Sequence, residues 1–419
     1  MSSLALALPA AAQGLRVIPL PPPASPRDLL YNPISNKLYA ANTPQTGAPS
    51  AESVSIIDGA TDAILATLPM LAGPRDFCLN TRTNRVFVAN YFADSVTVID
   101  GVSDQVVAVI AVGDGPRALC YNPVDDRVYC ANEFSGNVTV IDGSSHGILA
   151  TVQVGSTPRV ICHNPANNKV YCPNAGSQTL SVISGSTNSV VATVPVGAVP
   201  RGILFNPQGN RVYCSNYGSD TVTVIDGASD AVIATVPVGD GPTAMVHNPI
   251  GNKVYVANVG APGPGTPPTC SVSVISGESN GIVRTIPAGD EPTAFCYSRA
   301  DRRIYWVNEW SHDVAIVDAA TDVQVGSVPL GTSQVQPVDI AYNPVNRVVY
   351  TANRLTFAIG VLGTGVLACP PDLDRSGAVD GGDLSVLLGA WGTPFADLDG
   401  DDRTDGYDLG ILLSRWGPC

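Results

Sequence analysis

The chain of 419 residues is 45% hydrophobic and only 14% charged, and it contains 41 glycines and 35 prolines. This composition excludes a mainly helical protein and is typical of an all-β fold with many tight turns, and no apolar run reaches the roughly eighteen residues that a membrane-spanning helix needs. The net charge of −14 argues against a nucleic-acid partner, because phosphates call for a basic surface.

The N-terminus is expected to be the remnant of a signal peptide, covering residues 1–12. Leu4–Ala12 is a short apolar run that ends in small residues suited to cleavage before Gln13. The alternative is a frayed, alanine-rich end. Ten cysteines, an even number, also favour an oxidising compartment. We therefore expect an exported protein, extracellular or on the cell surface.

A repeat begins at an Asn-Pro turn and recurs with a spacing of 42 residues between Asn80 and Asn248. Counting its degenerate copies gives eight units, although seven remain possible if one of them is miscounted. Each unit has four strand-like segments, here called A, B, C and D, rich in Val, Ile and Tyr and separated by turn residues. A fixed period of this length with four strands per unit predicts a β-propeller over residues 13–363.

The last unit lacks strand D, and the first part of the chain supplies a candidate for it. Arg16–Leu20 reads RVIPL and matches the D strand TVPV of Thr193–Val196. We expect this N-terminal strand to complete the last blade and so to remove two exposed sheet edges.

Strand B ends in a tetrapeptide that identifies a known repeat. It occurs, for example, as YAAN, FVAN, YCAN and YTAN, at residues 39–42, 87–90, 129–132, 171–174, 213–216, 255–258, 305–308 and 350–353. The region resembles the YVTN β-propeller repeat family. The resemblance implies the fold and is weak for function, since similar propellers include surface-layer proteins, binding proteins and relatives of lactone-cleaving enzymes.

The face that carries the D-to-A and B-to-C loops holds the candidate binding residues. Strand A is the innermost in such propellers, and in five consecutive blades an arginine follows the proline near its start: Arg27, Arg75, Arg117, Arg159 and Arg201. These residues are expected to form an arc of positive charge at the channel mouth, suited to an anionic ligand. The B-to-C loops add aromatic residues suited to sugar or peptide binding: Tyr91, Phe92, Phe134, Tyr217 and Trp310. The alternative is that the arginines only bond neighbouring blades, as repeated framework residues do.

Catalysis finds little support in the sequence. His163 and His247 occupy strand A positions filled by aromatic residues in other blades, so packing is their expected role, and no nucleophile elbow or phosphate loop is present. If the protein is an enzyme, a lactonase or lyase acting at the channel mouth with Arg117, Glu133, Arg159 and Glu309 is the most plausible kind.

The C-terminal segment carries a net charge of −7 in residues 371–419 and contains two calcium-loop patterns. In the first, oxygen ligands are expected from Asp372, Asp374, Ser376, Asp380 and Asp383, with the Ala378 carbonyl as a sixth. In the second they are expected from Asp397, Asp399, Asp401, Asp405 and Asp408, with the Arg403 carbonyl. A calcium ion needs six to eight oxygen ligands, and a twelve-residue loop can wrap around it. Each loop is followed by an apolar segment that predicts a helix, LSVLLGAWG and LGILLSRWG.

This tandem pattern resembles a type I dockerin at residues 371–419, after a linker at 364–370. The resemblance implies two calcium ions and a cohesin-type partner. Asp402 in place of the turn glycine is a departure that predicts weaker binding in the second loop.

Three cysteine pairs are candidate disulfides. Cys369 and Cys419 bracket the C-terminal module, and a bridge there would close it. Cys120 with Cys130, and Cys162 with Cys172, are expected to face each other across A–B hairpins, although buried free thiols are an equal alternative.

Together these features predict a monomeric, exported and non-catalytic propeller that binds a carbohydrate or an anionic ligand. The dockerin would attach it to a cohesin, in a polysaccharide-degrading or cell-surface assembly. The alternatives are the enzyme above and a purely structural surface protein.

Overall fold

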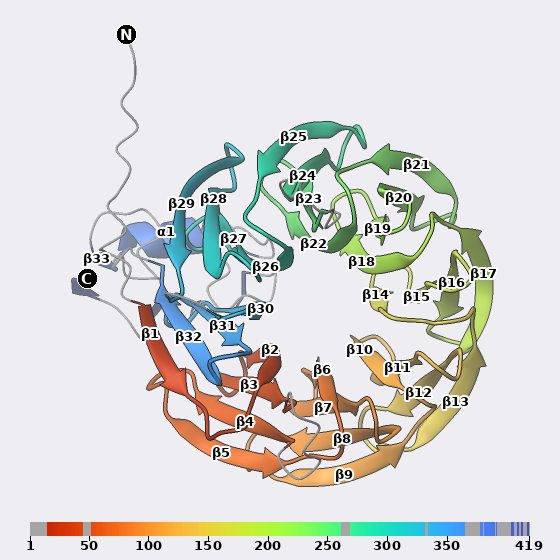
Figure 1. The fold of residues 1–419 in the computed structure, drawn as a ribbon, viewed down its shortest axis with the longest axis horizontal. Helices are drawn as coiled ribbons and strands as arrows, with labels where there is room; N and C mark the ends of the chain where they lie inside the picture. The colour runs from red at the N-terminus through yellow and green to blue at the C-terminus, as the bar shows by residue number, and fades with distance from the viewer. Residues whose placement is uncertain are drawn as a thin grey trace.

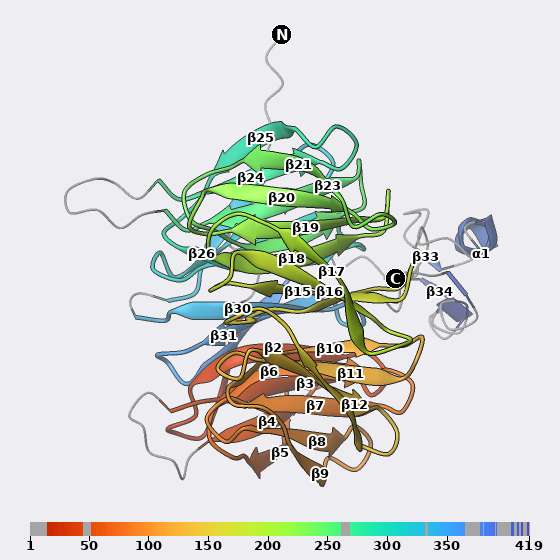
Figure 2. The same cartoon turned by 90° about the vertical axis from the view of Figure 1, so that its right-hand side faces the viewer.

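Eight four-stranded antiparallel sheets surround a central axis as the blades of a propeller (Figure 1). The computed structural model describes residues 15–44, 52–260, 269–331, 334–364, 378–379, 381–389, 391, 404–405, 409, 412–413 and 417–418. Figure 2 shows the ring from the side, with the strands of each blade running across its thickness. The predicted propeller is confirmed, with eight blades rather than seven.

The two inner strands of every blade are A and B. The A strands, closest to the axis, are β2 (Pro26–Asn32), β6 (Pro74–Asn80), β10 (Pro116–Asn122), β14 (Cys162–Asn164), β18 (Pro200–Asn206), β22 (Pro242–Asn248), β26 (Pro292–Ser298) and β30 (Pro337–Asn343). The B strands are β3 (Lys37–Asn42), β7 (Arg85–Asn90), β11 (Arg127–Asn132), β15 (Lys169–Asn174), β19 (Arg211–Asn216), β23 (Lys253–Asn258), β27 (Arg303–Asn308) and β31 (Val348–Asn353).

The two outer strands are C and D. The C strands are β4 (Ser53–Asp58), β8 (Ser95–Asp100), β12 (Asn137–Asp142), β16 (Thr179–Ser184), β20 (Thr221–Asp226), β24 (Ser271–Ser276), β28 (Asp313–Asp318) and β32 (Ala358–Gly363). The D strands, at the rim, are β5 (Ile64–Pro69), β9 (Val106–Ala111), β13 (Ile148–Gln153), β17 (Ser189–Pro195), β21 (Val232–Pro237), β25 (Ile282–Pro287), β29 (Val323–Pro329) and β1 (Leu15–Pro19).

The ring closes through the N-terminal strand, as predicted. β1 is the outermost strand of the last blade and pairs antiparallel with β32, from Leu15 opposite Leu362 to Pro19 opposite Ala358. The first and last parts of the chain therefore share one sheet, and β32 has no unpaired edge.

The hydrophobic core lies between neighbouring blades. In one cluster, Phe87 and Val98 of the second blade pack with Leu119 and Val128 of the third. Strands B and C are buried on both faces, which explains why they read as nearly continuous apolar runs.

The repeated asparagines of the sequence are framework residues. The asparagine that ends strand B bonds across to strand C of its own blade: the Asn216 side-chain amide donates to the hydroxyls of Thr221 and Thr223 at 3.1 and 2.9 Å. The asparagine of the Asn-Pro turn ties one blade to the next, as Asn122 does by donating to Asn168 at 2.8 Å. The recurrence of these residues follows from the fold and indicates no ligand.

The C-terminal region is described only in part. Helix α1 spans Gly381–Gly389, three residues earlier than the predicted apolar segment begins, and Leu387 within it is buried. β33 (Ala378–Val379) pairs with β34 (Gly417–Pro418). Among the described residues no helix is long and apolar enough to cross a membrane.

The predicted hairpin disulfides are wrong. Cys120 lies opposite Tyr129, and Cys130 lies opposite Leu119, so the two cysteines are offset by one residue and point to opposite faces of the sheet. Cys162 likewise lies opposite Tyr171, not Cys172. All four are free thiols, as the alternative predicted, and burial raises the pKa of Cys162 and of Cys172 to about 12. Cys369 and Cys419 lie outside the described residues.

Candidate functional site

The arginine arc is positioned by a β-bulge that recurs at the start of strand A. In the third blade Pro116 pairs with Asn132 and Ala118 pairs with Ala131, so Arg117 between them has no partner on β11. An extra residue at a bulge leaves the ladder and its side chain is re-aimed. The same shift frees Arg27, Arg75 and Arg201.

The fourth blade departs furthest from the repeat. β14 begins only at Cys162, and a single bridge from Pro158 to Asn174 precedes it. The segment from Arg159 to Ile161 therefore lies outside the sheet ladder, beside the axis.

Glu133 holds two of the arc arginines. Its carboxylate accepts hydrogen bonds from Arg117 Nη1, Arg159 Nε and the Tyr91 hydroxyl, each at 2.8 Å, and its side chain is only 4% exposed. Burial by itself would raise the pKa of Glu133, but the Tyr91 hydroxyl and the two guanidinium groups outweigh it and the pKa is lowered. Glu133 is thus a fixed anion that orients Arg117 and Arg159.

Two further arc arginines stack on tyrosine rings instead of pairing with a carboxylate. The guanidinium carbon of Arg75 lies 4.7 Å from the ring centre of Tyr91, and that of Arg201 lies 3.6 Å from the ring centre of Tyr217. Cation–π contacts position a guanidinium without neutralising it. Tyr91, predicted as an exposed aromatic, is buried at 8% exposure and so serves as a support.

The remaining aromatic candidates are exposed. Phe92, Phe134 and Trp310 are 66%, 68% and 54% exposed. Tyr91 joins the first two in a cluster, with ring centres 4.9 Å from Phe92 and 5.5 Å from Phe134. The structure therefore brings Phe92 and Phe134 beside the arc through Tyr91.

A sixth guanidinium that the sequence reasoning missed extends the arc. Arg354 Nη2 donates to the Gln336 side chain at 2.9 Å, and Nη1 of the same guanidinium lies 3.8 Å from the carboxylate of Glu309. Arg27 lies close to it, since burial and the positive charge of Arg354 both lower the pKa of Arg27. Burial and the neighbouring Glu291 raise the pKa of Glu309.

Three aspartates beside the arc were also missed. Asp28, Asp76 and Asp339 follow the bulge position in three adjacent blades, where other blades have Ala, Val or Gly. Asp76 Oδ2 accepts the Leu119 N–H at 2.6 Å, and Asp339 Oδ2 accepts the Leu29 N–H at 2.7 Å, each from the next blade. The signal was available in the sequence as Asp after Pro-Arg or Pro-Val.

Burial is the largest cause that raises the pKa of each of the three aspartates. Burial raises the pKa of Asp76 to about 7 and that of Asp339 to about 6. Burial and the charge of Asp339 raise the pKa of Asp28 well above its usual range. We call these residues the aspartate triad.

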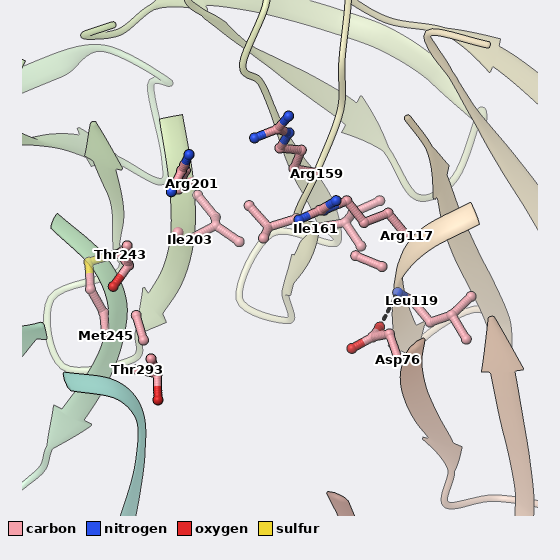
Figure 3. Close-up of a pocket in the computed structure, with 14 residues that line it drawn as sticks. Asp76, Arg117, Leu119, Arg159, Ile161, Arg201, Ile203, Thr243, Met245 and Thr293 are labelled. Carbon is pink, nitrogen blue, oxygen red and sulfur yellow. Dashed lines mark hydrogen bonds between the residues drawn. The ribbon is translucent and has the colours of Figure 1, made fainter. Parts of the chain in front are cut away.

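Arg117, Arg159 and Arg201 line one cavity of about 560 Å³ near the axis (Figure 3). Asp76 lies on its wall, and Thr243 and Thr293 contribute hydroxyl groups from the opposite side. We call it the mouth cavity. Its volume lies in the range of about 300–1,000 Å³ that is usual for small-molecule sites.

The other predicted site residues are not brought into this cavity. His163 contacts Asn168 at 3.4 Å, and burial lowers its pKa, as expected for a packed histidine. Of the twelve predicted calcium ligands, only Ala378, Asp383 and Asp405 belong to the described residues. Among the residues that the structure describes, no group of three or more His, Cys, Asp or Glu could hold a metal ion.

Comparison with known proteins supports the fold and leaves the activity open. A model of the family described as "Lactonase, 7-bladed beta-propeller" matches residues 102–232, which is less than half of the chain but includes Arg117, Glu133, Arg159 and Arg201. No curated protein matches.

Two solved structures illustrate the likeness of fold. Hydrazine synthase of Kuenenia stuttgartiensis is 21% identical with a TM-score of 0.56, covering 70% of this chain and 96% of that one. The dihydro-heme d1 dehydrogenase NirN, in complex with DHE, is 15% identical with a TM-score of 0.63, covering 82% and 73%. The chain is therefore an eight-bladed β-propeller repeat protein that is similar, over part of its length, to lactonase-type propellers.

Proposed function

We propose that the protein is an exported, non-catalytic propeller that binds an anionic ligand in the mouth cavity. The observation that carries this proposal is the concentration of positive charge there on a protein of net charge −14. Arg117, Arg159 and Arg201 line the cavity, and Glu133 is the one carboxylate that pairs with two of them. Arg27, Arg75 and Arg354 belong to the arc outside the cavity lining. The raised pKa values of the aspartate triad, about 7 for Asp76 and about 6 for Asp339, reduce the negative charge that these residues add near neutral pH.

Arg201 is the residue best placed to bind the ligand. It is exposed, lines the cavity and has no carboxylate partner among the described residues. Arg117 and Arg159 contribute at their guanidinium edges, but their pairing with Glu133 also makes them structural. The alternative that the arginines only stabilise the fold therefore applies to Arg117 and Arg159 in part, and it does not apply to Arg201.

Titration calorimetry with citrate and with galacturonate tests the proposal. Arg201→Gln should weaken binding at least about tenfold, since a hydrogen bond to a charged group contributes about 1.5–3 kcal/mol. Arg82→Gln, an exposed arginine on the opposite turns, is the matched control. Affinity should also fall as pH rises through 6–7, because the triad then ionises. Absence of binding by either anion at low salt would contradict the proposal.

The C-terminal residues 371–419 are proposed to be a dockerin that binds two calcium ions. Support comes from the donor set: Asp372, Asp374, Ser376, Asp380 and Asp383 are oxygen donors at the loop spacing that calcium requires, and the second loop repeats it. The described helix α1 begins at Gly381, within the last three residues of the first loop. When bound, calcium would neutralise the clustered carboxylates.

The proposed partner is a cohesin-type module. The protein is proposed to be exported and to lie outside the cell or on its surface. The protein would then be carried into a polysaccharide-degrading or cell-surface assembly as a monomer, with the propeller at 13–363 as the binding part. Calcium-dependent co-elution with a purified cohesin tests this; failure of several cohesin types to co-elute would contradict it.

A second candidate function is a hydrolase of lactonase type. Asp76 favours it: a carboxylate whose pKa burial has raised to about 7 lies on the wall of the same cavity as Arg117 and Arg159. Such a group can accept a proton from water near neutral pH, and the guanidinium groups could stabilise the developing oxyanion. Glu133, one of the residues expected at an enzyme site, is committed to its three hydrogen bonds. Lactone hydrolysis that is lost in Asp76→Asn would favour the enzyme over the binding protein.

A further inference from the structure

A second cavity of about 460 Å³ lies beside the mouth cavity in the third blade. One side is the B-to-C loop with Glu133, Phe134 and Gly136, and the other is the connection from Gln153 to Thr157. Gln153 ends β13, the outermost strand of its blade, and Thr157 leads through Pro158 to Arg159 at the axis. The cavity is therefore a radial groove that runs outward from the mouth.

Glu133 separates the radial groove from the mouth cavity. It lines the groove, while its carboxylate bonds Arg117 and Arg159, which line the mouth cavity. A ligand that spans both cavities would pass this ion-pair cluster.

The groove is open because Gly136 replaces a side chain that other blades use to fill it. In five blades the side chain at this loop position accepts a hydrogen bond from a backbone N–H of the following D-to-A connection. The acceptor side chains are those of Glu52, Asp94, Asp220, Cys270 and His312, and the donors are the N–H groups of Gly73, Gly115, Gly241, Glu291 and Gln336, in the same order. Gly136 cannot do so, and within the described residues the equivalent Thr157 N–H has no acceptor. A backbone donor is thereby left for a ligand.

The remaining groove chemistry is aromatic and hydroxylic. Phe134 is 68% exposed, and its ring is held in place by Tyr91 at 5.5 Å and by close packing over Gly115. Ser156, which contacts the Ser177 hydroxyl at 2.9 Å, lies on the opposite wall, which also includes Gln153. A fixed apolar ring facing neutral donors and acceptors is the arrangement that suits the apolar face and hydroxyl groups of a sugar ring.

We propose that the ligand of the mouth cavity is a short acidic oligosaccharide whose second sugar lies in the radial groove, with a carboxylate on the arginines and the next ring against Phe134. This rests on the proposed anion-binding function. A peptide fits less well, because the groove presents loops whose backbone groups mostly bond one another and not an open strand edge.

Calorimetry with galacturonate and digalacturonate, each at equal charge per sugar, tests the proposal on the whole protein. Digalacturonate should bind about five to ten times more tightly, from the added ring contact. Phe134→Ala should reduce this ratio towards one. Gly136→Asn should do the same by filling the groove, and it should fold, because Asp94 and Asp220 adopt the same positive φ, 48° and 53°, as Gly136 at 63°. Asparagine tolerates this conformation and adds no charge.

Gln178→Asn, at the same loop position in the next blade, is the matched control and should leave the ratio unchanged. Equal binding of the two sugars by the native protein would overturn the groove proposal and leave the anion site intact. Binding of neither would overturn both. A glutamyl-glutamate dipeptide that gained over glutamate as much as the disaccharide gains over the monomer would show that the groove is no sugar site.

Discussion

The aspartate triad should make the propeller less stable as pH rises. A carboxyl group whose pKa is higher in the folded than in the unfolded state stabilises the fold below its unfolded pKa, and this contribution is lost as pH rises through the folded value. For Asp76 the pKa rises from 3.8 to about 7, which corresponds to roughly 4 kcal/mol at 1.36 kcal/mol per pH unit. The loss should fall between about pH 4 and pH 7.

Asp76→Asn isolates this effect. Asparagine resembles the protonated acid and its Oδ1 can still accept the Leu119 N–H, so the variant should match the native protein at pH 4. At pH 8 it should be more stable, by up to roughly 4 kcal/mol, because it avoids burying a charge near Asp28 and Asp339. The charge of Arg75, which favours the ionised form, is already included in the pKa of about 7.

Urea unfolding of both proteins from pH 4 to pH 8 measures the difference. Asp226→Asn is a control of opposite sign, because the Ser229 hydroxyl and N–H lower the pKa of Asp226 and the ionised form stabilises the fold above its unfolded pKa. A native-minus-variant difference for Asp76 that does not change with pH, or a variant that is less stable at pH 8, would refute the reasoning.

Three further outcomes follow from the fold. Deleting Leu15–Pro19 should expose the edge of β32, lower the melting temperature and promote association in sedimentation; a monomeric variant with an unchanged melting temperature would contradict the closing role of β1. Asn216→Ala should cost about 1–3 kcal/mol in urea unfolding by removing two buried hydrogen bonds, and no loss would mean that the motif asparagine is not structural. Chelation should remove calcium from residues 371–419 and abolish cohesin binding without changing the melting temperature of the propeller. Without a chelator, calorimetry should find two bound calcium ions per chain, and no bound calcium would exclude the dockerin.

The sequence predicted the fold well because nearly every repeat contains the same turn residues and the same apolar strand segments. Turn residues at a constant spacing fixed the strands, and the missing last D strand pointed to Arg16–Leu20, which overlaps the observed β1. Register was harder to predict, because it depends on the number of residues in the turn. Asn122 pairs with Arg127 across a four-residue turn, which places Cys120 and Cys130 one residue out of alignment.

The candidate site was predicted as a set of positions but not as a network. The arginines follow a repeated proline, so the sequence located them. It did not show that Glu133 holds two of them, or that Tyr91 turns inward beneath Arg75, because those contacts join different blades. Contacts between repeats depend on the angle between blades, which a single repeat does not contain.

Departures from the repeat are the better guide to function in such a chain. A residue that occurs in every blade satisfies a need shared by every blade, as Asn216 and its equivalents do, and therefore cannot distinguish one region of the ring from another. Gly136, the shortened β14 and Asp76 of the aspartate triad each break the pattern, and each borders the mouth cavity or the groove beside it. Asp76, Gly136 and the shortened β14 lie in the second, third and fourth blades. Packing alone does not explain them, since the fifth, sixth and seventh blades pack without any such departure. A ligand that contacts only this part of the ring explains why they occur together.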